Sequence, residues 1–154
     1  MRNSYLLLVA SVLLVVSSLA YSQSSAYDSV DPFIGTGADG NTFPGATLPF
    51  GMIQWSPDTR PDAWYHYADK TIRGFSLTHI SGAGCPLYGD VPVLPWTKPI
   101  AESDDPSKFT VGFSHDKEEA KPGYYELQLE NGTKTELTVS ERAGIARFAF
   151  PSGG

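Results

Sequence analysis

Hydrophobic and polar residues alternate regularly in the last third of the chain, beginning just after Gly123. Tyr125, Leu127 and Leu129 would lie on one face of an extended segment, and the polar residues between them would lie on the other. Alternation with a period of two is the pattern of a β-strand that buries one face and exposes the other. We therefore predict a strand that begins near Gly123 and ends near Glu130.

An Asn-Gly pair, Asn131-Gly132, follows this strand directly. Both residues tolerate a positive φ, so the pair predicts a two-residue hairpin turn of type I′. The return strand then places Thr135, Leu137 and Val139 on the inward face. Asn131 also begins an Asn-Gly-Thr sequence, which is an acceptor sequence for N-glycosylation.

A second turn near residues 142–144 leads into a third strand over residues 145–150, in which Ala146, Phe148 and Phe150 share a face. Three successive antiparallel strands form a meander whose apolar face needs a second layer. The upstream residues look too irregular to supply a complete layer. We therefore predict an all-β fold, an antiparallel β-sandwich that is incomplete in this chain, and interpret the chain as the opening part of a larger protein.

The first half of the chain differs from this meander. Residues 28–99 are rich in Gly, Pro, Asp and aromatic residues and show few regular periods. Residues 104–120 are predicted to form a charged connection that carries at most a short edge strand over 109–115. Because long loops on a β-scaffold commonly carry binding residues, we expect the site in the first half.

The N-terminus has the pattern of a secretory signal peptide. Arg2 supplies a positive start, residues 5–16 are almost wholly apolar, and small residues precede an expected cut between Ala20 and Gln23. A membrane anchor would need about 20 apolar residues, and this run is shorter. We predict a signal peptide over residues 1–22, a domain over 23–154 with no membrane span after cleavage, and a secreted or periplasmic protein.

Composition excludes several classes of protein. The 154 residues include 15 Gly and 12 Pro, which argues against a helical bundle because both residues break helix interiors. The formal net charge is −6, so no basic surface is expected to follow a phosphate backbone and a nucleic-acid partner is excluded.

Three glycines, Gly35, Gly37 and Gly40, match the dinucleotide-binding pattern G-x-G-x-x-G. That site requires a helix immediately after the third glycine. Prolines at positions 44 and 49 forbid one here. We reject a dinucleotide site and predict instead a tight loop that holds Asp39 and Asn41 at its tip.

The three histidines share no spacing that is typical of metal ligands, so each is interpreted as a hydrogen-bonding or surface residue: His66, His79 and His115. Cys85 is the single cysteine of the chain. Spacing alone does not show a base within reach of its thiol, so a thiol hydrolase is disfavoured.

Aromatic residues gather around Trp64 and Tyr65, and Trp55 and Trp96 lie at either side in the sequence. Aromatic rings stack on the apolar face of a sugar while fixed polar groups bind its hydroxyls. The same rings could equally fill the core. Composition leaves both interpretations open.

Two blocks of sequence resemble the N-terminal signature of glycoside hydrolase family 92. The first is Val30-Asp31-Pro32-Phe33-Ile34-Gly35-Thr36-Gly37, with Asp39-Gly40-Asn41-Thr42-Phe43-Pro44-Gly45-Ala46 and Pro49-Phe50-Gly51-Met52. The second is Ser56-Pro57-Asp58-Thr59, then Thr71-Ile72-Arg73-Gly74-Phe75-Ser76, Thr78-His79, Ser81-Gly82, Gly84-Cys85 and Tyr88-Gly89-Asp90. The resemblance covers essentially the whole mature chain.

The resemblance implies a secreted, calcium-dependent, inverting exo-α-mannosidase that acts on mannose-containing glycans. Its N-terminal domain would resemble the galactose-mutarotase-like β-sandwich, and a helical-barrel domain absent from this chain would follow. That barrel would supply the general acid, the general base and most calcium ligands, so this fragment alone is expected to be inactive.

The contribution implied for this chain is a wall of the sugar pocket. No catalytic residue and no metal ligand is expected within it. The substrate-contacting residues are predicted to be Asp39, Asn41, Trp64, Tyr65, His79, Cys85 and Asp90. Two further hypotheses stay open, namely a stand-alone carbohydrate-binding module and a structural buttress without activity.

Overall fold

The computed structural model describes residues 26–61, 64–79 and 90–152 of the chain. The predicted signal peptide and Cys85 lie outside these residues. Within the described part, no helix is long and apolar enough to cross a membrane. Helical structure there is confined to two short 3₁₀ turns, η1 (Ala26–Ser29) and η3 (Pro106–Lys108).

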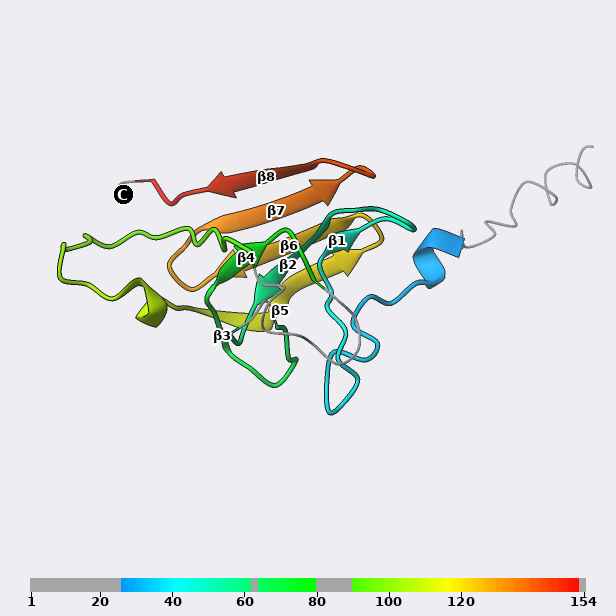
Figure 1. Cartoon of the computed structure of the whole chain (residues 1–154), viewed down its shortest axis with the longest axis horizontal. Coiled ribbons are helices and arrows are strands. Elements are labelled where there is room, and N and C mark those ends of the chain that lie inside the picture. The colour runs from blue at the N-terminus through cyan, green and yellow to red at the C-terminus, as the bar shows by residue number, and fades with distance from the viewer. Residues whose placement is uncertain (1–25, 62–63, 80–89, 153–154) are drawn as a thin grey trace, which may run out of the picture.

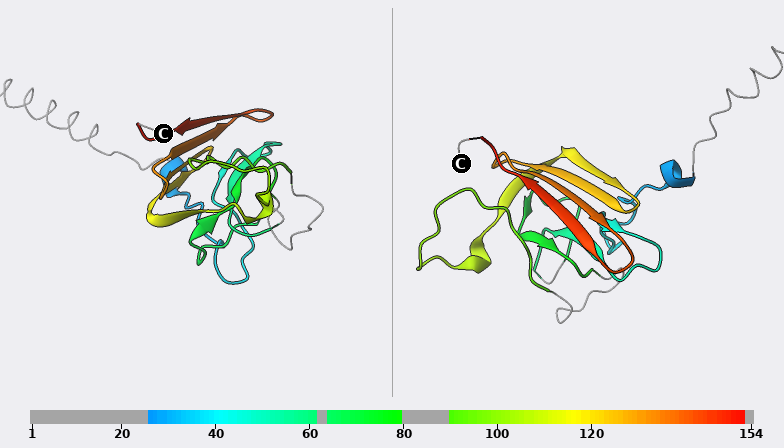
Figure 2. Two further views of the ribbon diagram at one scale, coloured as in Figure 1. Left: turned by 90° about the vertical axis from the view of Figure 1, so that its left-hand side faces the viewer. Right: turned by 90° about the horizontal axis from the view of Figure 1, so that it is seen from above.

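Two antiparallel sheets make up the fold (Figure 1). The larger sheet has the order β3-β5-β6-β7-β8, with bounds Thr71–Ile72, Val111–Lys121, Tyr124–Leu129, Lys134–Val139 and Gly144–Ala149. The smaller sheet has the order β1-β2-β4, with bounds Ala46–Thr47, Gln54–Asp58 and Gly74–Ser76. Figure 2 shows the short strands lying on one face of the larger sheet. The prediction of an all-β sandwich is confirmed.

The predicted meander is present as β6, β7 and β8. Its alternation works as expected, because Tyr125, Leu127 and Leu129 are buried while their neighbours in the strand are half-buried. Phe148 in β8 is also half-buried. The prediction that Phe150 shares this inward face is wrong. Phe150 lies beyond the end of β8 and is 54% exposed, because the pleat that aims alternate side chains inward ends with the strand.

The predicted type I′ turn between β6 and β7 is also wrong. Gly132 has φ +87°, but Asn131 is not among the described residues with positive φ. Gly132 N donates to Leu129 O at 3.0 Å, and Leu129 N donates to Thr133 O at 2.9 Å. These bonds define a three-residue loop that ends in a left-handed glycine, in which only the last position needs a positive φ.

The structure also corrects the prediction for residues 104–120. β5 runs from Val111 to Lys121, well past the short edge strand that was expected, and it lies between β3 and β6 inside the sheet. Phe113 pairs with Leu129 and Glu118 with Leu127, so β5 carries three extra residues in a bulge. This bulge breaks the alternation of polar and apolar residues, which explains why the strand is hard to recognise from sequence.

The core lies between the two sheets. Phe75 of β4 packs against Tyr125 of β6 and Phe148 of β8, with ring centroids 6.4 and 6.2 Å apart. Ile72 and Leu137 are fully buried in the same cluster. The upstream half therefore supplies a real but small second layer, built from short strands that the irregular sequence did not reveal.

Candidate functional site

A shallow cleft of about 410 Å³ lies where the β1–β2 connection meets the end of β4. Gly123, in the β5–β6 turn, donates from its N–H to Thr47 O at 2.9 Å and so fixes β1 at this end of the larger sheet. The cleft is lined by Phe43, Thr47, Leu48, Phe50, Gly51, Gln54 and His79. An aromatic and amide lining of this kind suits a sugar, which offers both an apolar face and hydroxyl groups.

A buried histidine–aspartate pair supports the floor of this cleft. His79 Nε2 lies 2.8 Å from Asp58 Oδ1, and the two side chains are 1% and 6% exposed. His79 Nδ1 lies 2.9 Å from Gln54 O. Both ring nitrogens therefore lie within hydrogen-bond distance of an oxygen atom, which fixes the orientation of the buried ring.

The ends of the segment that follows β4 are held together by a second carboxylate. Asp90 Oδ2 accepts a hydrogen bond from Leu77 N at 3.0 Å, and Oδ1 accepts from the same N–H at 3.3 Å. The Asp90 carboxylate therefore lies beside the backbone N–H of Leu77, directly after β4. Sequence reasoning treated Asp90 as a sugar contact, and that role stays a prediction.

The glycine-rich segment forms the predicted tight loop. Gly35 has φ +82° and Asn41 has φ +54°. Thr42 N donates to Gly35 O at 3.2 Å, and a Cβ placed on Gly40 would lie 2.2 Å from that same oxygen. Asp39 is exposed at the tip of the loop. No helix follows in the described residues from Asn41 onward to β1, so the geometry agrees with the rejection of a dinucleotide site.

The predicted aromatic wall divides into two different environments. Trp64 is half-buried, and its carbonyl accepts hydrogen bonds from Thr59 N at 2.8 Å and Arg60 N at 3.0 Å. Tyr65 is only 2% exposed and belongs to the core. The ring of Tyr65 therefore presents no open face in this chain, and its contact with sugar stays a prediction.

Glu118, at the end of the bulge of β5, joins three other side chains. Its carboxylate accepts from Tyr65 Oη at 3.0 Å, from Tyr125 Oη at 2.6 Å and from His115 Nδ1 at 2.5 Å. Burial and the adjacent Glu118 carboxylate raise the pKa of Tyr65 and of Tyr125 well above the ordinary value for tyrosine. Both phenols therefore stay protonated and act as donors.

This cluster also anchors the glycine-rich loop. His115 stacks on Tyr67 with ring centroids 4.0 Å apart and an angle of 12° between the planes. Phe33 contacts the same tyrosine edge-on at 5.9 Å, and Tyr67 N donates to Thr36 O at 2.9 Å. The loop therefore rests on Tyr67, and Tyr67 rests on the bulge of β5.

The structure connects three of the predicted wall segments. The glycine-rich loop contacts the segment after Trp64 through Tyr67, and Phe43 beyond that loop lies 5.1 Å from the ring of His79. Cys85, which was predicted to contact the sugar, lies outside the described residues. Asp90 is tied to the end of β4, away from the loop tip at Asp39.

Sequence reasoning missed the Glu118 cluster and Phe50. His115 and Glu118 stand three positions apart, a spacing at which strand residues point to opposite faces, so only the bulge brings them together. Phe50 has φ +61° and is fully exposed at the rim of the cleft. The Pro49-Phe50-Gly51 sequence is the signal that could have indicated this turn.

The described residues do not fit a calcium site. No group of three or more His, Cys, Asp or Glu side chains there could hold a metal ion. Asp69 is partly buried, which raises its pKa, but hydrogen bonds from Arg60 and Thr59 outweigh burial and lower it overall.

Comparison with known proteins identifies the same architecture elsewhere. The family model described as glycosyl hydrolase family 92 N-terminal domain matches residues 29–154. A family 92 alpha-mannosidase from Bacteroides thetaiotaomicron has 40% identity and a TM-score of 0.65 over 81% of this chain and 18% of its own. It is also known in complex with mannoimidazole.

Two further relatives agree. A family 92 inverting mannosidase from Bacteroides thetaiotaomicron has 31% identity and a TM-score of 0.70, covering 86% of this chain and 19% of its own. An uncharacterized secreted glycosidase from Arthroderma benhamiae is 36% identical over 135 residues, which is 79% of this chain and 17% of the relative. The chain thus spans less than a fifth of the length of the relatives it matches.

Proposed function

The chain belongs to glycosyl hydrolase family 92 as its N-terminal domain, and from this we propose that it forms the carbohydrate-contacting domain of an inverting exo-α-mannosidase. The family match over residues 29–154 carries this proposal. The cleft supports it, because the lining combines the aromatic ring of Phe43 with the amide of Gln54 beside the glycine-rich loop. The substrates would be α-mannosides of glycans.

The proposed reaction needs two carboxyl groups that this chain does not offer at the cleft. In an inverting hydrolysis, one carboxylic acid protonates the leaving oxygen as the glycosidic bond breaks. A second carboxylate takes a proton from the water that attacks the opposite face, at a separation of roughly 6.5–9.5 Å. Among the described residues, none that lines the cleft carries a carboxylate.

Two carboxylates of the first half, Asp58 and Asp69, are engaged in structural contacts. Asp58 accepts from Ser76 Oγ at 2.9 Å in addition to facing His79. Asp69 pairs with Arg60, its Oδ2 lying 2.8 Å from Nε. We therefore place the acid and the base, and any calcium ion with its ligands, in the remainder of the enzyme, with this chain forming a wall.

Activity on a defined substrate tests the proposal. The enzyme extended through its remaining domains should hydrolyse α-linked mannobiose, and proton NMR should detect β-mannose as the first product. The 154-residue chain alone should show no turnover. Turnover by the short chain, or α-mannose as the first product, would contradict the proposal.

A second experiment separates a pocket wall from a structural buttress. Trp64→Ala in the extended enzyme should lower kcat/KM by tenfold or more if this part contacts the sugar. A buttress predicts an unchanged kcat/KM and a lower melting temperature. Lys117→Ala, at an exposed position in the bulge of β5, is the matched control and should change neither quantity.

Secretion is part of the proposal and is supported by the name of the fungal relative. We propose that residues 1–22 are removed during export. N-terminal sequencing of the exported protein should begin at Gln23 or within a residue or two of it. A mature protein that retains Met1 would contradict this part.

A further inference from the structure

A second cavity lies at the opposite end of the larger sheet from the cleft. The cleft borders the β5–β6 turn, whereas this cavity of about 220 Å³ borders the β6–β7 hairpin at Glu130 and Asn131. The six residues of β6 separate the two turns, a distance of about 20 Å. The cavity has the volume of roughly seven liquid waters, which is the space that one sugar ring and its hydroxyls fill.

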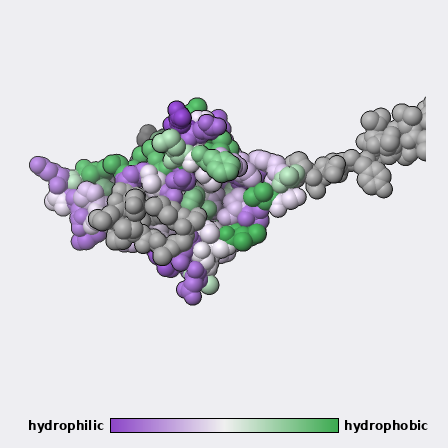
Figure 3. All heavy atoms as spheres, turned by 45° about the vertical axis from the view of Figure 1, so that its right-hand side comes forward, coloured by the Kyte–Doolittle hydropathy of each residue, from purple (hydrophilic) through white to green (hydrophobic). Residues whose placement is uncertain are grey.

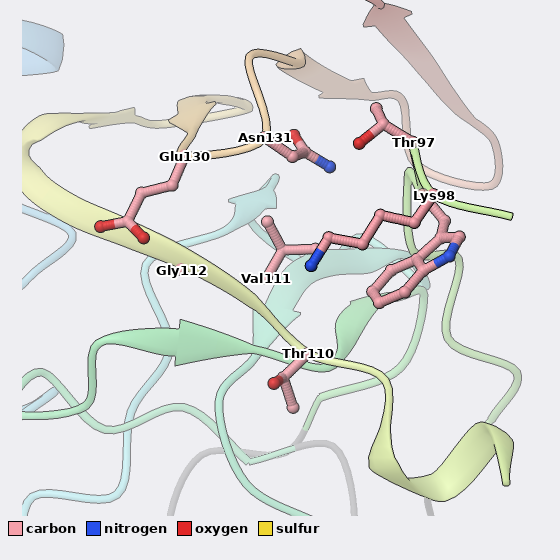
Figure 4. A pocket seen from close by; sticks show the side chains of 8 residues that line it. Thr97, Lys98, Thr110, Val111, Gly112, Glu130 and Asn131 are labelled. Carbon is pink, nitrogen blue, oxygen red and sulfur yellow. The ribbon is translucent and has the colours of Figure 1, made fainter. Parts of the chain in front are cut away.

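The cavity combines opposite charges that do not pair with each other. Lys98 extends into it from one side and Glu130 lies on the other (Figure 4). Within the part of the chain that the structure describes, neither side chain forms a salt bridge. Thr97 and Thr110 also line the space. Figure 3 shows that hydrophobic and hydrophilic side chains are interspersed on the face that it displays.

The walls are held in place by contacts of the lining residues with one another and with their neighbours. Trp96 stacks on Phe109 with centroids 4.7 Å apart, and the Lys98 ammonium lies 5.7 Å from the centre of the indole. Asn131 Nδ2 donates to Pro95 O at 2.8 Å, which ties the hairpin to the segment that carries Trp96. The cavity is therefore preformed, which lowers the entropic cost of binding.

Glu130 has a defined position as well. Its backbone N–H donates to Gly112 O at 2.9 Å. A Cβ placed on Gly112 would lie 2.0 Å from Glu130 Oε2, so the carboxylate rests directly on this glycine. Any side chain at position 112 would displace it.

From this arrangement we propose that the cavity is a second carbohydrate site, which binds a single uncharged hexose unit. A phosphate would be repelled by Glu130 and a metal cation by Lys98. A hydroxyl group, in contrast, accepts a hydrogen bond from an ammonium and donates one to a carboxylate, so neighbouring hydroxyls of one ring satisfy both groups. Val111 and the part of Trp96 that lines the cavity offer the apolar contact that a pyranose ring uses. The site is separate from the cleft and does not depend on the proposed mannosidase activity.

The test uses the extended enzyme with its principal sugar site saturated by mannoimidazole. Methyl α-D-mannopyranoside and methyl α-D-glucopyranoside are then titrated and followed by saturation-transfer NMR, with glycine as a compact zwitterionic probe. We expect at least one glycoside to bind. Lys98→Met, Glu130→Gln and Gly112→Ala should each weaken its binding tenfold or more.

Two charge variants elsewhere on the surface serve as controls. Lys117→Met and Glu141→Gln lie at exposed positions away from the cavity and should leave the binding unchanged. The proposal would be overturned if neither glycoside binds or if glycine alone binds. It would also be overturned if none of the three cavity substitutions changes the affinity for the glycoside. If mannoimidazole fails to bind, the mannosidase proposal fails, but the response to the cavity substitutions still decides the second site.

Discussion

Tyr65 and Glu118 are joined by a hydrogen bond, Oη to Oε1 at 3.0 Å, across 53 positions of the chain. Tyr65 belongs to the irregular first half and Glu118 to the bulge of β5 in the larger sheet. The bond therefore fastens the segment that carries the predicted sugar contacts to the part of the domain with the most regular structure.

Replacement of Glu118 with Gln should destabilise the domain by about 3 kcal/mol. The carboxylate is fully buried and receives donors from Tyr65, Tyr125 and His115, and an amide presents them with one acceptor oxygen and two competing hydrogens. Urea unfolding followed by fluorescence measures the effect. Glu141→Gln, an exposed site, should change stability by less than about 0.5 kcal/mol. Equal effects of the two substitutions would contradict the role given to Glu118.

The buried tyrosines should resist ionisation until the protein unfolds. Burial and Glu118 raise the pKa of Tyr65 and Tyr125 above the unfolded value near 10. Because the raised pKa favours the neutral form, this stabilisation is complete below pH 10 and is lost as the pH rises above it. Absorbance of phenolate near 295 nm, followed together with circular dichroism, should show these two groups titrating only as the fold is lost. Titration near pH 10 with the fold intact would contradict the cluster.

Phe50→Ala should leave the stability of the domain nearly unchanged, whereas Phe50→Gly should give a more stable domain than Phe50→Ala. The ring is fully exposed, so Phe50→Ala should change stability by less than about 0.5 kcal/mol. The residue has φ +61°, which glycine adopts without strain, so Phe50→Gly should be more stable than Phe50→Ala by about 1 kcal/mol. Thermal unfolding of both variants makes the comparison. A glycine variant less stable than the alanine variant would show that the turn is not strained.

Asp58→Asn should destabilise the domain by about 3 kcal/mol and reduce turnover by the extended enzyme. The substitution replaces the carboxylate oxygen that lies 2.8 Å from the buried His79 ring, and a buried polar group that loses its partner is costly. Gln54, which lines the cleft, accepts at its carbonyl from the same ring. Asp116→Asn, at an exposed position, is the matched control for unfolding and kcat/KM. Retention of parental stability in Asp58→Asn would show that the carboxylate is not needed to hold the buried ring.

Asp69 should contribute to loss of stability in acid. Hydrogen bonds from Arg60 and Thr59 lower its pKa below the ordinary 3.8 despite partial burial. A lowered folded pKa gives stability that is present above about pH 4 and is lost as the pH falls through the folded pKa. Asp69→Asn should therefore flatten the dependence of unfolding free energy on pH between about 5 and 2. An unchanged dependence would show that Asp69 is not ionised in the fold.

The regular half of this domain was determined by the sequence itself. Tyr125, Leu127 and Leu129 alternate with polar residues, and a period of two places them on one face whatever the rest of the chain does. The all-β class and the three-strand meander follow from this local pattern. The rejection of a dinucleotide site was equally local, since prolines after Gly40 forbid the helix that such a site requires.

Tertiary structure alone decided the features that join distant segments. The bulge of β5 brings His115 and Glu118 together, which no spacing rule for a strand predicts, and the fold then presents Tyr65 to the same carboxylate. His79 meets Asp58 only because β2 carries this carboxylate beside the end of β4. Alternation reports which way neighbouring side chains point, whereas these contacts depend on register and packing between segments, and those are set by the free energy of the whole fold.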